Sequence, residues 1–205
     1  MIRPFGESAL LVETGSAERA QALATTVRES MHEVVAVVAG LESLLVELDA
    51  TADLAAAARS LEQLVAAVEP APVAGREVTV PVVYGGDTGP DLAEVAGLLA
   101  MSEEKVIERH LASDLRVLFV GFAPGFGYLG RLPDELRVPR LATPRTRTPA
   151  GSVAIAGSMA GIYPADLPGG WRIIGRTDLT LFDPRGDPPA LLSPGDRVRF
   201  VRLDR

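Results

Sequence analysis

The chain contains no cysteine among its 205 residues, so it can form neither a disulfide framework nor a thiolate metal site. It also lacks any apolar run approaching the roughly 18–20 residues that a membrane-spanning helix needs. Its first residues, MIRPFGESALLVE, have no basic segment followed by an apolar one, so no signal peptide is predicted. These absences predict a soluble protein that acts in the cytoplasm and contacts no membrane.

Positive charge is scarce in the first third of the chain and is almost never supplied by lysine. Residues 1–75 hold 11 acidic residues and 4 arginines, whereas residues 76–205 hold 16 acidic and 16 basic residues. An acidic module argues against nucleic acid as a partner, because that binding relies on clustered Lys and Arg. Lys105 is the only lysine, and arginine suits planar recognition of carboxylates and phosphates. A genome of high GC content would also favour arginine, so both explanations stay open.

The first 70 residues alternate between short β-rich runs and helical patterns. Strands are predicted at 8–13, 34–39 and 43–48, and helices after the capping residues Ser16 and Thr51. The order ββαββα indicates a small two-layer α+β domain.

The segment 69–75, EPAPVAG, is the best candidate for a connector between domains, because proline and glycine interrupt regular structure there. We therefore expect one domain at 1–75 and a second at 76–205.

The second part of the chain has a different pattern of predicted elements. A strand is predicted at 76–84, and helices are predicted to begin at Pro90 and at Ser102. Beyond Leu115 no helix is indicated. Short apolar runs separated by Gly and Pro favour an all-β barrel or sandwich there. The runs are RVLFVGF, SVAIAG, WRIIGRT, LTLF and DRVRFV.

A glycine-rich stretch, GFAPGFGYLG at 121–130, cannot form a stable helix or a long strand. It predicts a loop whose backbone is held in a special conformation. The loop is either a structural turn or a binding loop. Its candidate ligand contacts are Pro124, Gly125, Phe126 and Tyr128.

From Leu136 to Ala165 the chain has four arginines and no acidic residue, although the whole chain carries a formal charge of −7. Arg145 and Arg147 are two residues apart in a segment that the prolines favour as extended, so both would project from one face. Such a pair suits a carboxylate or phosphate. Pro149, Gly151 and Ser152 complete the candidate site. The alternative is a basic strand whose arginines pair with acids brought from elsewhere in the fold.

A third stretch, GIYPADLPGGWRIIGRT at 161–177, contains the only tryptophan of the chain. A tryptophan after a glycine turn is often a core anchor. Together with the other two stretches, it could instead form an aromatic wall beside a further arginine. The candidate contacts are Tyr163, Gly169, Gly170, Trp171, Arg176 and Thr177.

The two histidines support little chemistry on their own. His32 follows a predicted helix, and His110 lies near the end of another, where a structural role and proton transfer are both open. The chain has no HExxH, GxSxG or Walker A motif and no metal-spaced His/Asp cluster. No metal site is predicted, and the residues do not indicate catalysis by this chain alone.

Taken together and in order, five segments resemble one family. The segments are VPVVYGGDTGPDLAEVA, GFAPGFGYLG, LATPRTRTPAGSVAIAG, GIYPADLPGGWRIIGRT and LLSPGDRVRF. They are similar to the family whose members are named B subunit of 5-oxoprolinase, allophanate hydrolase subunit 1 or sporulation-kinase inhibitor. The distinctive match covers about 80–205. The resemblance implies an α+β protein in which a cyclophilin-like β-barrel follows the small α+β domain.

The resemblance also implies a function that needs partners. It implies a non-autonomous subunit of an ATP-dependent hydrolase that opens 5-oxoproline to glutamate. The partners would be a second cyclophilin-like protein (the C subunit, or allophanate hydrolase subunit 2) together with a third component, the A subunit. ATP is expected at the level of the complex. The alternatives are a regulator that binds and inhibits a histidine kinase, and half of a biotin-dependent carboxyltransferase.

Within that function, Arg145 and Arg147 are predicted to bind the small carboxylate substrate or a phosphorylated intermediate. Tyr128, Tyr163 and Trp171 would form the wall of the site. Arg176 would be a supporting cation and His110 a candidate for proton transfer. Replacing Arg145 by alanine is expected to lower turnover by about tenfold or more with little loss of folding.

Overall fold

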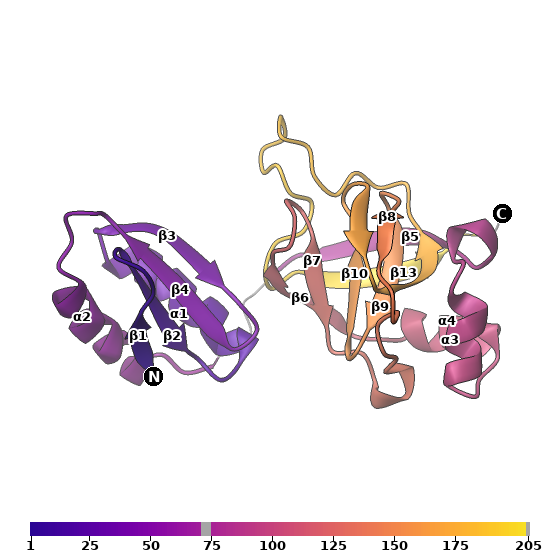
Figure 1. The fold of residues 1–205 in the computed structure, drawn as a ribbon, viewed down its shortest axis with the longest axis horizontal. Helices are drawn as coiled ribbons and strands as arrows, with labels where there is room; N and C mark the ends of the chain where they lie inside the picture. The colour runs from indigo at the N-terminus through magenta and orange to yellow at the C-terminus, as the bar shows by residue number, and fades with distance from the viewer. Residues whose placement is uncertain (71–74, 204–205) are drawn as a thin grey trace. The chain divides into compact units, whose positions relative to one another are not determined.

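The computed structural model describes residues 1–70 and 75–203. The chain divides into two compact units, Met1–Ala74 and Gly75–Arg205 (Figure 1). The predicted connector, 69–75, contains residues 71–74, which lie outside the described residues.

The first unit is a two-layer α+β structure. Its elements are β1 (Ile2–Pro4), β2 (Ala9–Glu13), α1 (Ala17–Ser30), β3 (Val34–Ala39), β4 (Ser43–Leu48) and α2 (Leu54–Ala67). The strands form one antiparallel sheet in the order β1-β2-β4-β3. Both helices pack their apolar stripe on this sheet, and the shared core includes Leu10, Leu23, Leu44 and Leu61.

The helix starts in this unit confirm one predicted cap and correct the other. Ser16 caps α1, because its hydroxyl accepts a hydrogen bond from the Arg19 N–H at 3.2 Å. The prediction that Thr51 caps α2 is wrong. Asp53 caps that helix and accepts from the N–H groups of Ala55 and Ala56.

The second unit is built on a closed β-barrel, which confirms the α+β fold class with a barrel after the small domain. Its strand order is β10-β7-β6-β13-β5-β12-β9, with β13 parallel to β5 and the other pairs antiparallel. The barrel strands are β5 (Glu77–Tyr84), β6 (Leu115–Val120), β7 (Gly127–Gly130), β9 (Ser152–Ala156), β10 (Met159–Ile162), β12 (Arg172–Arg176) and β13 (Arg197–Arg202).

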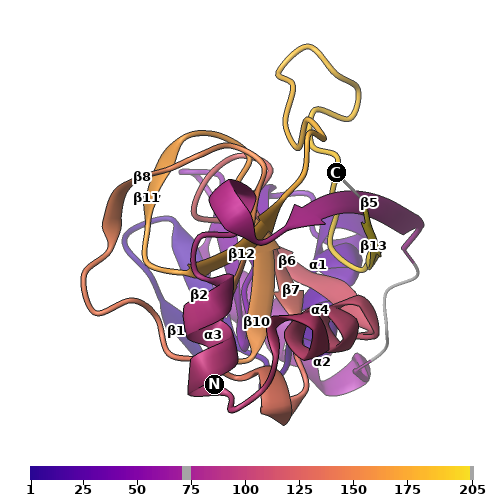
Figure 2. The same ribbon diagram turned by 90° about the vertical axis from the view of Figure 1, so that its right-hand side faces the viewer.

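Other elements surround the barrel. They are α3 (Leu92–Leu98), α4 (Glu103–Leu111), β8 (Arg145–Thr148), β11 (Leu167–Gly169) and the short 3₁₀ turns η1 (Gly86–Thr88) and η2 (Asp134–Leu136). Figure 2 shows α3 and α4 side by side in front of the barrel strands. β8 and β11 form a separate two-stranded sheet. None of the helices in the described part of the chain is long and apolar enough to span a membrane.

Three predictions in this unit need correction. The helix predicted to open at Pro90 begins at Leu92, after Asp91. The run LTLF forms no regular strand, because only Phe182 makes an isolated bridge, to Ala190. The stretch 121–130 is only half a loop: its second half is β7, a short strand in the barrel wall. A four-residue strand tolerates glycines that a longer strand would not.

The barrel strands alternate between two different cores. Val153 and Ile155 of β9 point into the barrel and join an almost entirely aliphatic cluster, which also contains Leu129 of β7. Ala154 and Ala156 of the same strand face outward and join a second, aromatic cluster. This alternation follows from the two-residue period of a β-strand. It gives the barrel an inner aliphatic core and an outer aromatic layer.

Candidate functional site

The outer layer consists of four aromatic rings packed edge to face on the outside of the barrel. The ring of Phe126 lies at its centre, with centroids 5.4 Å from Tyr163, 5.7 Å from Trp171 and 5.0 Å from Tyr128. The rings lie close to the strands because Gly161 has no side chain: a Cβ there would lie 2.9 Å from Phe126 Cζ and 3.1 Å from Trp171 Cζ3.

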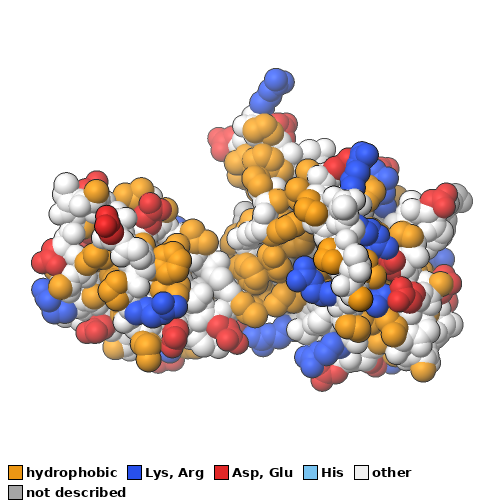
Figure 3. Space-filling model, in the orientation of Figure 1, with side chains coloured by type: hydrophobic (Ala, Val, Ile, Leu, Met, Phe, Trp, Pro, Cys, Tyr) orange, Lys and Arg blue, Asp and Glu red, His pale blue; other side chains and the backbone are white. Residues whose placement is uncertain are grey.

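The loop 121–126 holds the ring of Phe126 in this layer. The Gly121 N–H donates to the Phe126 carbonyl at 3.1 Å, and Gly125 has φ +79° with no room for a side chain beside Leu181 and Phe182. These contacts hold the backbone of 121–126 as a turn, and ligand binding by this stretch stays a prediction. The turn also leaves Phe122 58% exposed, with its ring against the edge of Phe126. Figure 3 shows hydrophobic side chains gathered on this unit over β6 and β7, with basic side chains beside them.

A cleft of about 350 Å³ opens beside the outer layer. It is lined by Tyr128, Pro139, Arg140, Ala156, Gly157 and Trp171. Two of these are aromatic, three are small or apolar, and one is a cation. No acidic residue lines it. The volume is at the small end of the range for ligand sites, so the cleft suits a small molecule with an apolar body and a negative group.

Arg140 is the cation of this cleft. Its side chain is exposed and makes no hydrogen bond or ion pair within the described residues. Its charge faces the phenols of the outer layer. Burial raises the pKa of both Tyr128 and Tyr163, and the positive charge of Arg140 partly opposes this by lowering it. Both phenols therefore stay neutral hydrogen-bonding groups near a free guanidinium.

Arg145 is held by a buried acid and does not face this cleft freely. Its guanidinium donates to Asp91, which is 5% exposed and also accepts from the Ile173 N–H at 2.7 Å. The pair joins the start of α3 to β8 and β12. This is the alternative in which an acid from elsewhere in the fold meets the arginine. Whether Arg145 also binds substrate stays a prediction.

Arg147 takes a different partner. It forms an exposed ion pair with Asp166, whose other oxygen accepts from the Ala150 N–H at 2.8 Å. Hydrogen bonds from that N–H and from Arg147 lower the pKa of Asp166. Arg145 and Arg147 therefore do not form a joint clamp in this structure, because a separate acid holds each guanidinium.

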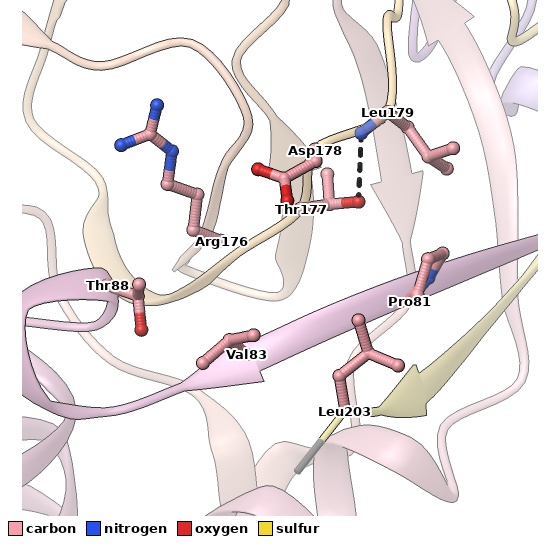
Figure 4. Close-up of a pocket in the computed structure, with 8 residues that line it drawn as sticks. All are labelled: Pro81, Val83, Thr88, Arg176, Thr177, Asp178, Leu179 and Leu203. Carbon is pink, nitrogen blue, oxygen red and sulfur yellow. Dashed lines mark hydrogen bonds between the residues drawn. The ribbon is translucent and has the colours of Figure 1, made fainter. Parts of the chain in front are cut away.

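A second group of predicted residues surrounds a separate hollow of about 250 Å³. Thr177 is buried, donates its N–H to the Gly151 carbonyl and accepts the Leu179 N–H at 3.3 Å (Figure 4). Figure 4 shows the guanidinium of Arg176 pointing away from Val83 and Leu203 on the other side of this hollow. Its charge instead lowers the pKa of Asp166, behind the larger effects of the hydrogen bonds.

The remaining residues near this hollow have structural contacts. Ser152 is buried, and its hydroxyl donates to the Pro149 carbonyl at 2.7 Å. Gly151 has φ +78°, and a Cβ there would lie 2.1 Å from the Thr177 carbonyl oxygen. These contacts close a tight turn between β8 and β9. They do not place Ser152 or Gly151 in the aromatic cleft.

His110 lies in neither place. It is completely buried, its Nδ1 is 2.8 Å from the Tyr84 hydroxyl, and its ring packs 4.5 Å from Phe200. Burial lowers the pKa of His110 to about 3, so the ring is neutral at physiological pH. These surroundings fit the structural role that the sequence left open for His110. Its role in proton transfer stays a prediction.

The structure thus brings together only part of the predicted set. Phe126, Tyr128, Tyr163 and Trp171 meet in the outer layer. Gly169 has no room for a side chain beside the Tyr163 hydroxyl, and Gly170 lies beside Pro144. The exposed Pro124 lies in the turn that seats them. Sequence reasoning missed Arg140, although it lies in the same acid-free stretch. The acid-free stretch itself could have indicated it, because the stretch contains four arginines. Three of them pair with acids that lie outside the stretch, and Arg140 is the fourth.

Comparison with known proteins places this architecture in a class. Residues 1–192 match the family described as carboxyltransferase domain, subdomain C and D. The match covers the α+β unit and the barrel unit as far as residue 192, which is short of the last barrel strand, β13.

The sequence relatives narrow the class. A protein of Haemophilus influenzae named as the B subunit of 5-oxoprolinase is 43% identical over 84% of this chain and 81% of its own length. Its namesake in Escherichia coli O157:H7 is 56% identical over 62% of this chain. The chain belongs to the family of 5-oxoprolinase B subunits. The match spans 58% of the length of the Escherichia coli relative and 59% of one from Bacillus subtilis.

Solved structures share the fold. TTHA0988 covers all of this chain with a TM-score of 0.80 and 34% identity, and the match spans 40% of that protein. PH0987 of Pyrococcus horikoshii is 40% identical over all of this chain and 98% of its own, with a TM-score of 0.62. The urea amidolyase of Kluyveromyces lactis has a TM-score of 0.78 at 22% identity, which shows a shared fold alone.

Proposed function

We propose that this chain is the B subunit of an ATP-dependent 5-oxoprolinase. The complex would open the lactam of 5-oxoproline to glutamate in the cytoplasm. The observation that carries the proposal is the identity of 43–56% to proteins named as the B subunit of that enzyme. In the reaction the lactam C–N bond breaks, water adds a hydroxyl to the carbonyl carbon and a proton to nitrogen, and ATP is hydrolysed.

The site supports a protein that binds substrate and needs partners for the chemistry. The cleft offers aromatic walls and one guanidinium, but its lining includes no acid, histidine or serine that could act as a base or nucleophile. His110 is buried and hydrogen-bonded away from the cleft. The catalytic groups would therefore come from the two partners, the second cyclophilin-like protein among them.

ATP does not fit the cleft of this chain by itself. The sequence has no Walker A loop, and the cleft supplies a single cation. Among the described residues, no group of three or more His, Cys, Asp or Glu is placed to hold a metal ion. We therefore assign ATP to the complex as a whole.

Two other functions have a specific observation in their favour. The family description names a carboxyltransferase domain, which supports half of a biotin-dependent carboxyltransferase. The exposed Phe122 and the hydrophobic surface over β6 and β7 support a regulator that docks on a histidine kinase.

One experiment separates the three functions. ATP hydrolysis that depends on 5-oxoproline would be measured for this chain alone, for the candidate C and A subunits alone, and for the full mixture. The proposal predicts turnover only in the full mixture. A stable complex without turnover would favour the carboxyltransferase function, and the absence of any complex would favour the kinase regulator.

A further inference from the structure

We propose that Arg140 is the residue that binds the carboxylate of the substrate, with the lactam ring lying against Tyr128 and Trp171, which line the cleft. This proposal rests on the proposed function, because it names the substrate contact within the same complex. It moves the binding role from Arg145 and Arg147, where the sequence alone places it, to a third arginine of the same stretch.

Arg140 is available, whereas its neighbours are occupied. Arg137 pairs with Asp134, Arg145 with Asp91 and Arg147 with Asp166. For Arg140 the described residues supply no such acid. An anion that reaches Arg140 would not have to displace an existing ion pair, whereas one that reaches Arg145 would leave the buried carboxylate of Asp91 without its cation.

The backbone on both sides of Arg140 is fixed. The Pro139 carbonyl accepts from Nε of Arg172 at 2.9 Å, and the Leu141 N–H donates to the Gly170 carbonyl at 2.7 Å. One residue further back, the Val138 carbonyl accepts from the Gly157 N–H at 2.7 Å. Arg172 is itself buried and ion-paired with Glu94. A segment held at three points loses less conformational freedom when Arg140 binds an anion.

The surroundings of the guanidinium favour a carboxylate. The aromatic and small side chains that line the cleft exclude water from one side of an anion and strengthen its attraction to Arg140. A guanidinium matches a carboxylate with two parallel hydrogen bonds. A phosphate bears more charge and usually recruits several donors, and the cleft lining provides no second cation.

The test measures the KM for 5-oxoproline in the full mixture, with wild type and with Arg140→Gln. Loss of one charge-assisted contact should raise KM about tenfold to a hundredfold and leave kcat nearly unchanged, because substrate and transition state share the contact. Arg137→Gln is the matched control, since it removes the same charge three residues away, outside the cleft. Arg140→Lys should recover part of the affinity.

A ligand that lacks the carboxylate distinguishes direct binding by Arg140 from a purely structural role. Binding to the full chain is followed by the fluorescence of Trp171, the only tryptophan and part of the cleft lining. 2-Pyrrolidinone should bind wild type and Arg140→Gln equally, whereas 5-oxoproline should prefer wild type. Equal loss for both ligands would overturn the proposal. Equally strong binding of inorganic phosphate would overturn the assignment to a carboxylate.

The two proposals fail in different ways. If the wild-type mixture shows no turnover, the proposed function fails, and the fluorescence titration alone decides the role of Arg140. If the mixture is active and Arg140→Gln has the KM of wild type, the proposed function stands and the Arg140 proposal is wrong. Absence of both turnover and 5-oxoproline binding would reject both.

Discussion

The inner and outer faces of the barrel wall are built from the same strands but serve different purposes. Inside, β7, β9 and β10 contribute aliphatic side chains such as Leu129, Ile155 and Ile162. Outside, β9 and β10 contribute alanine and glycine, on which Phe126 and Trp171 pack, and β7 contributes Tyr128. Small residues on the outer face leave room for a layer of rings, and beside that layer lies the cleft.

The difference between the two faces indicates which residues maintain the fold and which shape the site. The inner core is closed and almost purely apolar, so its substitution should act on stability. The outer layer is partly open and borders a cation, so its substitution should act on ligand binding with smaller effects on folding. Substitutions on the two faces can test this division, and the largest effect on stability is expected inside the barrel.

Leu129→Ala should lower the free energy of unfolding by about 2–5 kcal/mol, because it opens a cavity among fully buried neighbours. The adjacent Tyr128→Ala, on the outer face of the same strand, should have a clearly smaller effect because Tyr128 is only partly buried. Denaturant unfolding of both variants measures the difference. Equal losses would remove the distinction between the two faces.

Arg145→Ala should lower the free energy of unfolding by about 2–3 kcal/mol, because it leaves the buried carboxylate of Asp91 without its cation. The value is below that of a fully buried pair, since the Arg145 side chain is 30% exposed. Arg147→Ala, which breaks an exposed pair, should change stability by less than about 1 kcal/mol. Thermal unfolding of the two variants side by side checks this.

The same substitution bears on the role that the sequence assigned to Arg145. If Arg145→Ala abolishes turnover while stability is unchanged, Arg145 acts directly on the substrate, and its ion pair with Asp91 contributes little to the fold.

Gly161→Ala should destabilise the barrel by about 1–3 kcal/mol, because the new methyl group forces the rings of Phe126 and Trp171 outward. The displaced tryptophan should also change its fluorescence spectrum. Gly97→Ala is the control, because a Cβ at that helical position meets nothing within 4 Å and should be neutral or slightly stabilising. An unchanged spectrum in Gly161→Ala would show that the outer layer is not packed on this glycine.

His110 adds a smaller, pH-dependent effect. Because burial lowers the pKa of His110 to about 3, the unfolded chain takes up its proton at higher pH than the folded chain does. Stability from this group is therefore complete above pH 6.5 and falls below it. Between about pH 7.5 and 5.5 the free energy of unfolding should drop by about 1.4 kcal/mol. His110→Gln should flatten this slope, whereas His32→Gln, at an exposed position, should keep it.

Local signals predicted much of the fold. The strands at 34–39 and 43–48 and the caps Ser16 and Ser102 were predictable, because each depends on residues within a turn or two of sequence. Thr51 was mistaken for a cap because the helix begins later: Asp53 accepts the first free N–H groups, those of Ala55 and Ala56, and the Thr51 hydroxyl donates to Asp49 instead. The strand at Gly127–Gly130 was missed because pairing with β6 and β10 outweighs its glycine content.

The site was less predictable, because the arginines that are available to a ligand depend on ion pairs between residues far apart in sequence. Arg145 and Asp91 are 54 residues apart, and Arg147 and Asp166 are 19 apart. Without those pairs, the four arginines of the acid-free stretch look equivalent. Only the fold shows that Arg140 is left beside the aromatic cleft.

The most direct measurement of ligand binding at the aromatic cleft is an NMR titration of the full chain with 5-oxoproline, repeated in the presence of its partners. If the substrate lies beside Arg140, the indole N–H signal of Trp171 and the amide signals of 156–157 should shift together. Shifts confined to Thr177 and Leu179, around the other hollow, with Trp171 unmoved, would contradict binding at this cleft.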